Sequence, residues 1–217
     1  MSVVTGTAAP GKKMKFNIEP GEHYTIRRKV FKIFGAAFHI YDPTGGIAGY
    51  CKQKAFKLKE DIRIYTDESM SQELVTIKAR SVIDFGSTYD VTLPDGMSLG
   101  SLRRKGLAST FLRDSWLMFD ERNQQVAKVE EDNAFAAFCR RYIDYVSFFF
   151  PQRFTLKKMD GTEVAKFRQH FNPLIQKITI DFTPDVGNLL DRRLGLAAGI
   201  LLSAIEERQG DGLGIDI

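Results

Sequence analysis

Several short segments carry residue types that could perform chemistry, and each departs from the pattern that its chemistry requires. Residues 6–13, GTAAPGKK, match a phosphate-binding loop up to the last position, where Lys13 replaces the Ser or Thr that holds magnesium. No strand pattern precedes this segment and no helical pattern follows it. The three histidines, His23, His39 and His170, occur singly, without the spacing of a helical metal pair. We therefore predict neither a nucleotide loop nor a metal centre from these residues.

The acidic residues give no metal-ligand pattern either. Asp181, Asp185 and Asp191 lie in DFTPDVGNLLD, too far apart for the ligand spacing of an EF-hand. Asp185 and Asp191 are expected to shape a loop and the start of a helix, and the acidic run at 130–132 is expected on solvated turns or ends. A nucleophile elbow and a dinucleotide-binding glycine pattern are both missing from the sequence. The sequence thus predicts no catalytic residue, no metal site, no cofactor and no enzymatic activity.

Basic residues are the remaining candidates for binding. The net charge of +4 and the pI of about 9.0 favour anionic surfaces, but they are far below those of a dedicated nucleic-acid binder, so no nucleic acid is expected as a partner. The candidate ligands of a lipid head group are Lys52, Lys54, Arg103, Arg104 and Lys105. Because alternate residues of a strand share a face, Lys52 and Lys54, with Arg103 and Lys105, are expected to converge on one face that could hold phosphate. The alternative is a solvated outer face whose bases prevent edge pairing.

The elements that would position these bases are strands. Three segments repeat one design, a short run with aromatic and β-branched residues, an Asp/Gly turn and a second run. They are FHIYDPTGGIAGYCKQ from Phe38, YDVTLPDGMSLGSLRRK from Tyr89 and FTLKKMDGTEVAKFRQ from Phe154. Glycine supplies the positive φ of a tight turn, so each segment is predicted to be a β-hairpin, with a base at the same place in each: Lys52, Arg103 and Arg168. Further hairpins are predicted at 61–80 and 115–132, and further strands in 24–34 and in QKITIDF.

About a dozen short strands at this spacing indicate a sandwich or a barrel, and a closed barrel removes exposed edges. The series ends in LGLAAGILLSAI, residues 194–205, which is apolar on every face. At about 1.5 Å per residue it is about 18 Å long, whereas a membrane span needs about 20 residues. We therefore predict a buried core helix, in which Gly195, Gly199 and Ser203 form a smooth ridge for close packing. The alternative is a membrane anchor or a dimerising membrane helix.

The predicted fold is mainly β: a closed, roughly twelve-stranded antiparallel barrel that encloses a central hydrophobic C-terminal helix at about 188–208. The barrel domain is expected to cover 21–209, between flexible tails at 1–20 and 210–217. A second helical candidate lies at 134–141.

These segments carry a family resemblance. The chain resembles the tubby C-terminal-like superfamily, and within it the LURP-one-related and phospholipid-scramblase group, over roughly 24–208. The resemblance rests on the repeated Asp/Gly hairpins and on YDVTLPDGMSLGSLRRKGLASTFLRDSW, ITIDFTPD and DRRLGLAAGILLSAIEE. It implies a twelve-stranded barrel around a C-terminal helix, and basic residues on the barrel wall that bind phosphoinositide head groups, as in tubby proteins. The proline-rich region and cysteine cluster of scramblases are missing here, so scramblase activity is only a minor alternative.

The function expected from the sequence is that of a non-catalytic barrel that binds anionic phospholipid or phosphoinositide head groups at a membrane surface. A structural or protein-interaction barrel, with an unknown protein partner and no lipid ligand, is the alternative. Cys51 and Cys139 give no disulfide framework and fit a reducing compartment, and the first residues lack a secretory signal. We expect a cytoplasmic protein, peripheral at the membrane, without a transmembrane span.

Overall fold

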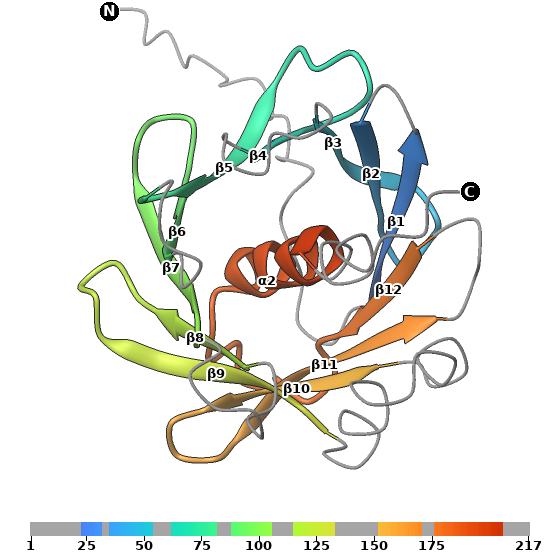
Figure 1. Cartoon of the computed structure of the whole chain (residues 1–217). Coiled ribbons are helices and arrows are strands. Elements are labelled where there is room, and N and C mark those ends of the chain that lie inside the picture. The colour runs from blue at the N-terminus through green and yellow to red at the C-terminus, as the bar shows by residue number, and fades with distance from the viewer. Residues whose placement is uncertain are drawn as a thin grey trace, which may run out of the picture.

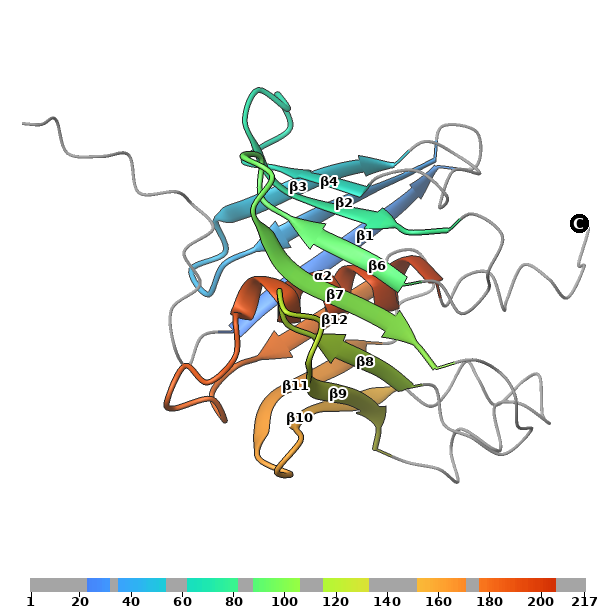
Figure 2. The ribbon, with the colours of Figure 1, turned by 90° about the vertical axis from the view of Figure 1, so that its left-hand side faces the viewer.

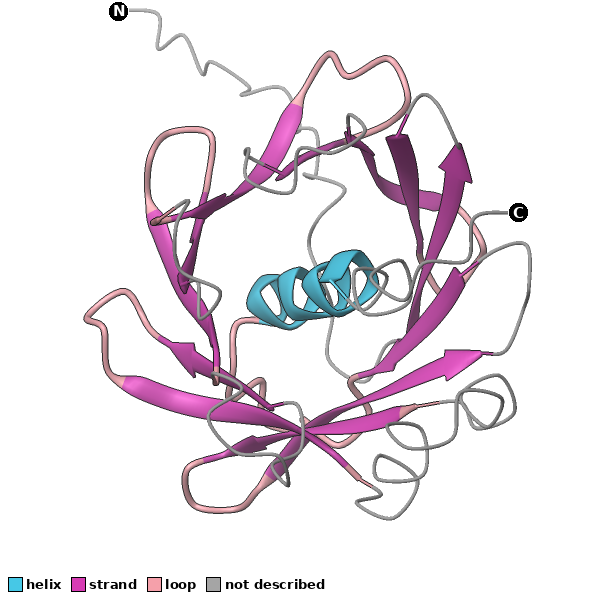
Figure 3. Ribbon diagram, in the orientation of Figure 1, coloured by secondary structure: helices cyan, strands magenta, loops and turns pink. Residues whose placement is uncertain are grey.

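The strands of the chain close into a barrel around one helix (Figures 1 and 3). The computed structural model describes residues 23–31, 35–53, 62–81, 88–105, 115–132, 152–170 and 176–205, and all structural statements below concern these residues. The strands are β1 (His23–Phe31), β2 (Gly35–Tyr41), β3 (Ile47–Gln53), β4 (Ile62–Tyr65), β5 (Glu73–Ala79), β6 (Thr88–Thr92), β7 (Ser98–Arg104), β8 (Ser115–Phe119), β9 (Gln125–Glu131), β10 (Arg153–Lys158), β11 (Glu163–His170) and β12 (Gln176–Asp181). The helix, α2, spans Arg192–Ile205.

The topology is a simple meander. Each strand pairs antiparallel with the next one in the chain, and β12 returns to pair with β1, so the barrel has no free edge. The closed antiparallel barrel of twelve strands with a C-terminal helix, predicted from the hairpin repeats, is confirmed.

Five tight turns share one geometry and explain why these sequences form hairpins. In each turn a backbone N–H donates to the carbonyl oxygen three residues earlier, and the donor residue has positive φ. Gly45, Gly96 and Gly161 occupy this position at φ 85°, 86° and 87° in the three repeated hairpins. Asn123 (φ 59°) and Met70 (φ 53°) occupy it in the two hairpins that lack the glycine. The register of the flanking strands shifts by one residue beside each turn, as in a bulged hairpin.

All five turns lie at one end of the barrel, which we call the hairpin end (Figure 2). The start of β1 and the start of α2 lie at the same end, because β12 runs towards it. The helix then runs through the barrel, and its last turn lies at the opposite end (Figure 2).

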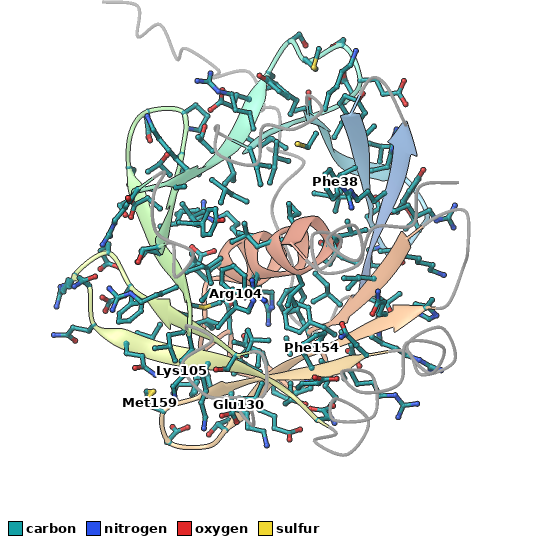
Figure 4. All side chains as sticks on the ribbon, viewed as in Figure 1. Phe38, Arg104, Lys105, Glu130, Phe154 and Met159 are labelled. Atoms are coloured by element: carbon teal, nitrogen blue, oxygen red, sulfur yellow. The ribbon has the colours of Figure 1, made fainter. Side chains whose placement is uncertain are left out.

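The inner face of the barrel and the helix together form the core. Phe38 and Phe154, for example, point inwards from β2 and β10, and each is almost fully buried (Figure 4). On the helix, Leu196, Ile200 and Leu201 have no exposed surface. Burial of the helix, predicted from its length and even apolar surface, is therefore confirmed. In the described part of the chain no helix combines the length and the apolar character that crossing a bilayer requires.

The two helical glycines allow the helix to approach the wall. A Cβ atom added at Gly195 would lie 2.7 Å from Cε1 of Phe182, and one added at Gly199 would lie 2.6 Å from Cδ1 of Ile180. Carbon atoms pack optimally at about 3.5–4.0 Å, so neither position has room for a side chain. The two glycines of the predicted ridge therefore pack against Phe182 and Ile180, and Gly199 also against Ile26 of β1.

The start of the helix is fixed by a buried ion pair and a cap. Arg192 donates to the backbone oxygen of Asp185 at 2.8 Å and to its carboxylate Oδ2 at 3.3 Å, and both residues are buried. The backbone N–H of Leu189 donates to Oδ1 of Asp185 at 2.8 Å. Asp191 caps the helix by accepting the backbone N–H of Arg193 at 2.9 Å. The prediction that Asp185 and Asp191 shape the loop and the helix start is confirmed.

The last turn of the helix receives a cation from the wall. Arg28, on the inner face of β1, donates to the backbone oxygen of Ser203 at 3.3 Å, and its guanidinium lies 5.3 Å from the ring centroid of Phe38. A cation is favourable at a helix C-terminus, where the carbonyl groups carry partial negative charge. Arg28 therefore anchors the helix to the first strand.

One sequence expectation is wrong. Glu131 was expected on a solvated turn or end, but it lies on the inner face of β9 with an exposed fraction of 4%. Alternation along β9 dictates this position, because Ala127 and Val129 also face inwards. The tails at 1–20 and 210–217 and the helical candidate at 134–141 lie outside the described residues.

Candidate functional site

The predicted head-group ligands lie on two separate parts of the wall. Lys52 lies near the end of β3, and Arg103 and Arg104 end β7, with Lys105 directly after them. Since β4, β5 and β6 lie between β3 and β7, the two positions are separated by roughly 19 Å around the wall at about 4.8 Å per strand. Lys54 lies outside the described residues. The structure therefore does not bring Lys52 and the bases of β7 into one cluster.

The bases of β7 also differ in direction. Arg103 lies on the outer face, where its Nε donates to Oγ1 of Thr88 at 3.0 Å and its guanidinium lies 4.7 Å from the ring centroid of Phe119. Arg104 shares the inner face with the buried Leu102 and points into the barrel (Figure 4). Lys105 is exposed. Arg103 and Lys105 can thus reach a ligand on the outer wall, whereas Arg104 is directed away from it.

A denser group of bases lies on the outer face of four adjacent strands. We call it the basic band: Arg27 of β1, Lys177 of β12, Arg168 of β11 and Arg153 of β10. Arg27 lies directly opposite Lys177, and Arg153 lies directly opposite Arg168. The two pairs are linked diagonally, because Lys177 is opposite His170, two residues along β11 from Arg168. Arg27, Arg153 and Arg168 are exposed and Lys177 is half-buried.

The electrostatics of the basic band are unfavourable for the isolated protein. Directly opposite residues have Cβ atoms about 4.5–5.5 Å apart, and like charges at that distance destabilise a sheet. Within the described ranges, none of the four bases forms an ion pair with a carboxylate. Burial lowers the pKa of His170, and the positive charges of Lys177 and Arg168 lower it further. Among the described residues the band therefore combines mutual repulsion with no ion pair to any of its four bases. The nearest acid in sequence register is Asp132, whose backbone N–H donates to the backbone oxygen of Arg153 at 2.9 Å.

Lys52 lies beside this band. It is exposed and lies opposite Ala37 of β2, and β2 in turn pairs with β1, where Arg27 lies opposite His39. Lys52 is thus two strands from Arg27 on the same outer face. The base that recurs at one position of the three repeated hairpins lies on the outer wall in each case: Lys52, Arg103 and Arg168. Arg168 belongs to the basic band, and Lys52 lies beside it.

Other chemistry finds little support among the described residues. No three His, Cys, Asp or Glu side chains in these ranges are arranged to hold a metal ion. Cys51 faces the core, and burial raises the pKa of its thiol to about 12, so the thiolate needed for nucleophilic attack does not form at neutral pH. His39 contacts Oε1 of Glu68 at 2.7 Å on the outer wall, which orients the imidazole but provides no nucleophile.

Comparison with known proteins agrees with this architecture, a closed β-barrel around a C-terminal helix. The model of the LURP-one-related family matches residues 47–202, and the chain belongs to this family. Among solved structures, the X-ray structure of a protein from Arabidopsis thaliana is similar with a TM-score of 0.50 and 12% identity, covering 86% of this chain and 93% of that chain. At this identity the likeness concerns the fold alone. A search of curated proteins returned no match.

Proposed function

We propose that this protein is a non-catalytic tubby-like barrel that binds anionic phospholipid or phosphoinositide head groups at the cytoplasmic surface of a membrane. The observation that carries the proposal is the basic band, with Arg27 opposite Lys177 and Arg153 opposite Arg168. The repulsion within these pairs is unfavourable in the free protein. A polyanionic surface would neutralise these charges, so relief of the repulsion would contribute to the free energy of binding.

The chemistry of the bases suits phosphate. Guanidinium groups donate paired, charge-assisted hydrogen bonds to phosphate oxygens, and three of the four bases in the band are arginines. Each base near an anionic membrane contributes about 1 kcal/mol, so the band offers roughly 4 kcal/mol before the cost of association. An exposed band across a sheet also suits a membrane face better than a small enclosed ligand.

The bases proposed from the sequence have unequal roles in this arrangement. Lys52 extends the band by two strands, and Arg103 and Lys105 provide a second contact farther round the wall. Arg104 faces the interior and is not proposed as a ligand. Scramblase activity is not part of the proposal, because α2 would have to leave the barrel core to enter a bilayer.

Vesicle sedimentation tests the proposal. The protein is expected to sediment with vesicles that contain phosphatidylserine or a phosphoinositide and to remain in solution with phosphatidylcholine alone. A double variant, Arg153→Gln with Arg168→Gln, should weaken binding about tenfold or more, since two contacts of about 1 kcal/mol are lost. The matched control, Arg63→Gln with Arg122→Gln, removes the same charge from exposed positions outside the band and should bind almost normally.

Three results would contradict the proposal. Binding that does not depend on lipid charge would exclude head-group recognition, and a stoichiometric protein partner under those conditions would favour the alternative of a protein-interaction barrel. Equal losses in the band variant and in the matched control would show only a general charge effect. Thermal unfolding shows whether the band variant is still folded when it fails to bind. Its midpoint should be unchanged or slightly raised, because the substitutions remove like charges that repel one another.

A further inference from the structure

A pocket lies at the hairpin end, away from the basic band. The turns β6–β7, β8–β9 and β10–β11, together with the loop before α2 and its first turn, surround a volume of about 730 Å³. Its apolar lining includes the buried Leu99, Leu190 and Leu194 and the more exposed Met97, Met159 and Leu189. Figure 4 shows Met159 at the turn that joins β10 and β11.

Contacts within the fold shape the pocket. A Cβ atom at Gly100 would lie 3.2 Å from Cδ1 of Leu194, so the glycine allows the helix start to pack against β7. Nε2 of Gln125 contacts the sulfur of Met159 at 3.1 Å and joins two of the turns. The loop that carries Leu189 is fixed by its backbone hydrogen bond to Asp185.

The rim of the pocket exposes large apolar side chains. The exposed fractions of Met97, Met159 and Leu189 are 53%, 58% and 51%, although all three line the same pocket. Single exposed apolar residues are ordinary, but several that converge on one hollow mark an interaction site. Methionine side chains are flexible and polarizable, and they are common on surfaces that bind varied apolar groups. A small ligand inside the hollow would leave much of this rim in water, so the occupant must extend over it.

The charge around the pocket is negative, in contrast to the net charge of +4 for the whole chain. Asp120, Glu121 and Asp160 belong to the lining and are met by Lys158, the only base of the lining. Asp191 is the fourth acid of the lining, and it is paired with Arg193 at 2.6 Å. Asp160 lies 3.4 Å from Lys158 and Glu121 lies 3.8 Å from Arg122, but these two pairs are solvent-exposed and contribute little, so both carboxylates stay accessible to a partner. An anionic membrane would be repelled from this end of the barrel. A cationic segment would be attracted to it.

We propose that the hairpin end is a docking site for a cationic segment of a protein partner, which inserts an apolar side chain between Met97, Met159 and Leu189. Lysine or arginine residues on either side of that side chain contact the carboxylates of Glu121 and Asp160. A second copy of this chain fits less well. The basic band has the right charge, but it offers no exposed large apolar side chain to insert into the pocket. The exposed large apolar residues of the described chain are Ile47, Met70, Met97, Met159, Val186 and Leu189, and none of them belongs to the band.

Selection from a phage-displayed peptide library tests the proposal directly. The whole protein serves as bait, and a double variant, Met159→Ala with Leu189→Ala, serves for counter-selection. Enriched peptides are expected to carry an aliphatic or aromatic residue flanked by Lys or Arg. Fluorescence anisotropy with an enriched peptide should show about tenfold weaker binding to the double variant, since apolar contact area is lost, and weaker binding as salt is raised.

Single variants separate the apolar and the charged contributions. Glu121→Gln should weaken the enriched peptide about threefold, whereas Glu130→Gln, on the outer wall of β9 (Figure 4), should leave its affinity unchanged. Met70→Ala removes another exposed methionine, with an exposed fraction of 42%, from the β4–β5 turn outside the pocket, and it should also have no effect.

Three results of the peptide experiments would overturn the proposal: no enrichment, enrichment of peptides without basic residues, or equal binding to the double variant. Concentration-dependent self-association that disappears in the double variant would assign the pocket to a second copy and would also overturn it. The proposal is independent of lipid binding. The pocket variants are expected to sediment with anionic vesicles as the unchanged protein does.

Discussion

Replacement of Leu201 by aspartate would test the enclosed helix most severely. Leu201 lies in α2 with no exposed surface, surrounded by the inner face of the barrel. Loss of the buried leucine side chain costs about 2–5 kcal/mol. The new carboxyl group must either remain ionised in an apolar core or take up a proton, and protonation at pH 7 costs about 4 kcal/mol from the three-unit difference to its usual pKa. The sum, about 6–9 kcal/mol, is comparable to the whole stability of a typical domain.

The single tryptophan provides the assay. Trp116 is almost fully buried at the start of β8, and its ring centroid lies 5.9 Å from that of Tyr89. Its emission should be blue-shifted in the native protein and should shift to the red on unfolding. The Leu201→Asp variant is expected to show the red-shifted emission and no cooperative urea transition at 25 °C.

Two controls make the result specific. Val186→Asp introduces the same group at a position with 87% exposure in the loop before the helix, and it should retain a normal urea midpoint. Leu201→Met conserves volume and should cost less than about 1.5 kcal/mol. A Leu201→Asp variant with native emission and an unchanged midpoint would refute the enclosed helix. A folded variant that had lost only vesicle binding would place the helix in the membrane instead.

Three further predictions concern the packing that supports both surfaces. Gly100→Ala places a Cβ atom 2.2 Å from a backbone carbonyl oxygen of β8 at a φ of 131°, and it should lower the free energy of unfolding by about 3 kcal/mol, measured by urea denaturation; an unchanged midpoint would contradict the close approach of β7 and β8. Arg192→Met leaves the carboxylate of Asp185 buried without its cation and should cost about 3–5 kcal/mol, part of which the added change Asp185→Asn should restore; no recovery would show that the pair is not coupled. In a Cys139→Ser background, Cys51 should not react with a disulfide reagent at pH 8 in the native state, because burial raises the pKa of its thiol to about 12, and it should react at once in urea.

The sequence predicted the elements of this fold because the signals are local. The Asp/Gly turns predicted hairpins, and the turn glycines Gly45, Gly96 and Gly161 adopt nearly the same positive φ. The apolar helix was too short to span a bilayer, and the barrel encloses it. The exact start of the helix is harder to predict, because both Asn188 and Asp191 are residue types that commonly cap a helix. In the structure Asp191 is the cap, because its Oδ1 accepts the backbone N–H of Arg193, whereas Oδ1 of Asn188 accepts from the side chain of Arg192.

The surfaces were harder to foresee because they depend on register. Arg27 and Lys177 are opposite one another only because the last strand pairs with the first, a contact that no local pattern reveals. Lys52 and Arg103 occupy equivalent positions of repeated hairpins, yet β4, β5 and β6 lie between β3, which carries Lys52, and β7, which carries Arg103. The sequence signals for the basic band were the repeated base at Arg168 and the basic run at 27–29, which contains Arg27. The pocket gave no signal at all, because each of its turns contributes a single methionine or a few acids.

The position of the helix within the chain has a consequence for folding. The core element follows all twelve strands, so during synthesis the strands leave the ribosome before the helix that they must enclose. The bond from Arg28 to Ser203 joins residues 175 positions apart, and contacts of such separation form slowly because a long loop must close first. Until then the inner faces of the strands lack their partner and are prone to aggregation. The order of the elements therefore predicts that the apolar inner faces of the barrel stay exposed during synthesis until its last segment arrives.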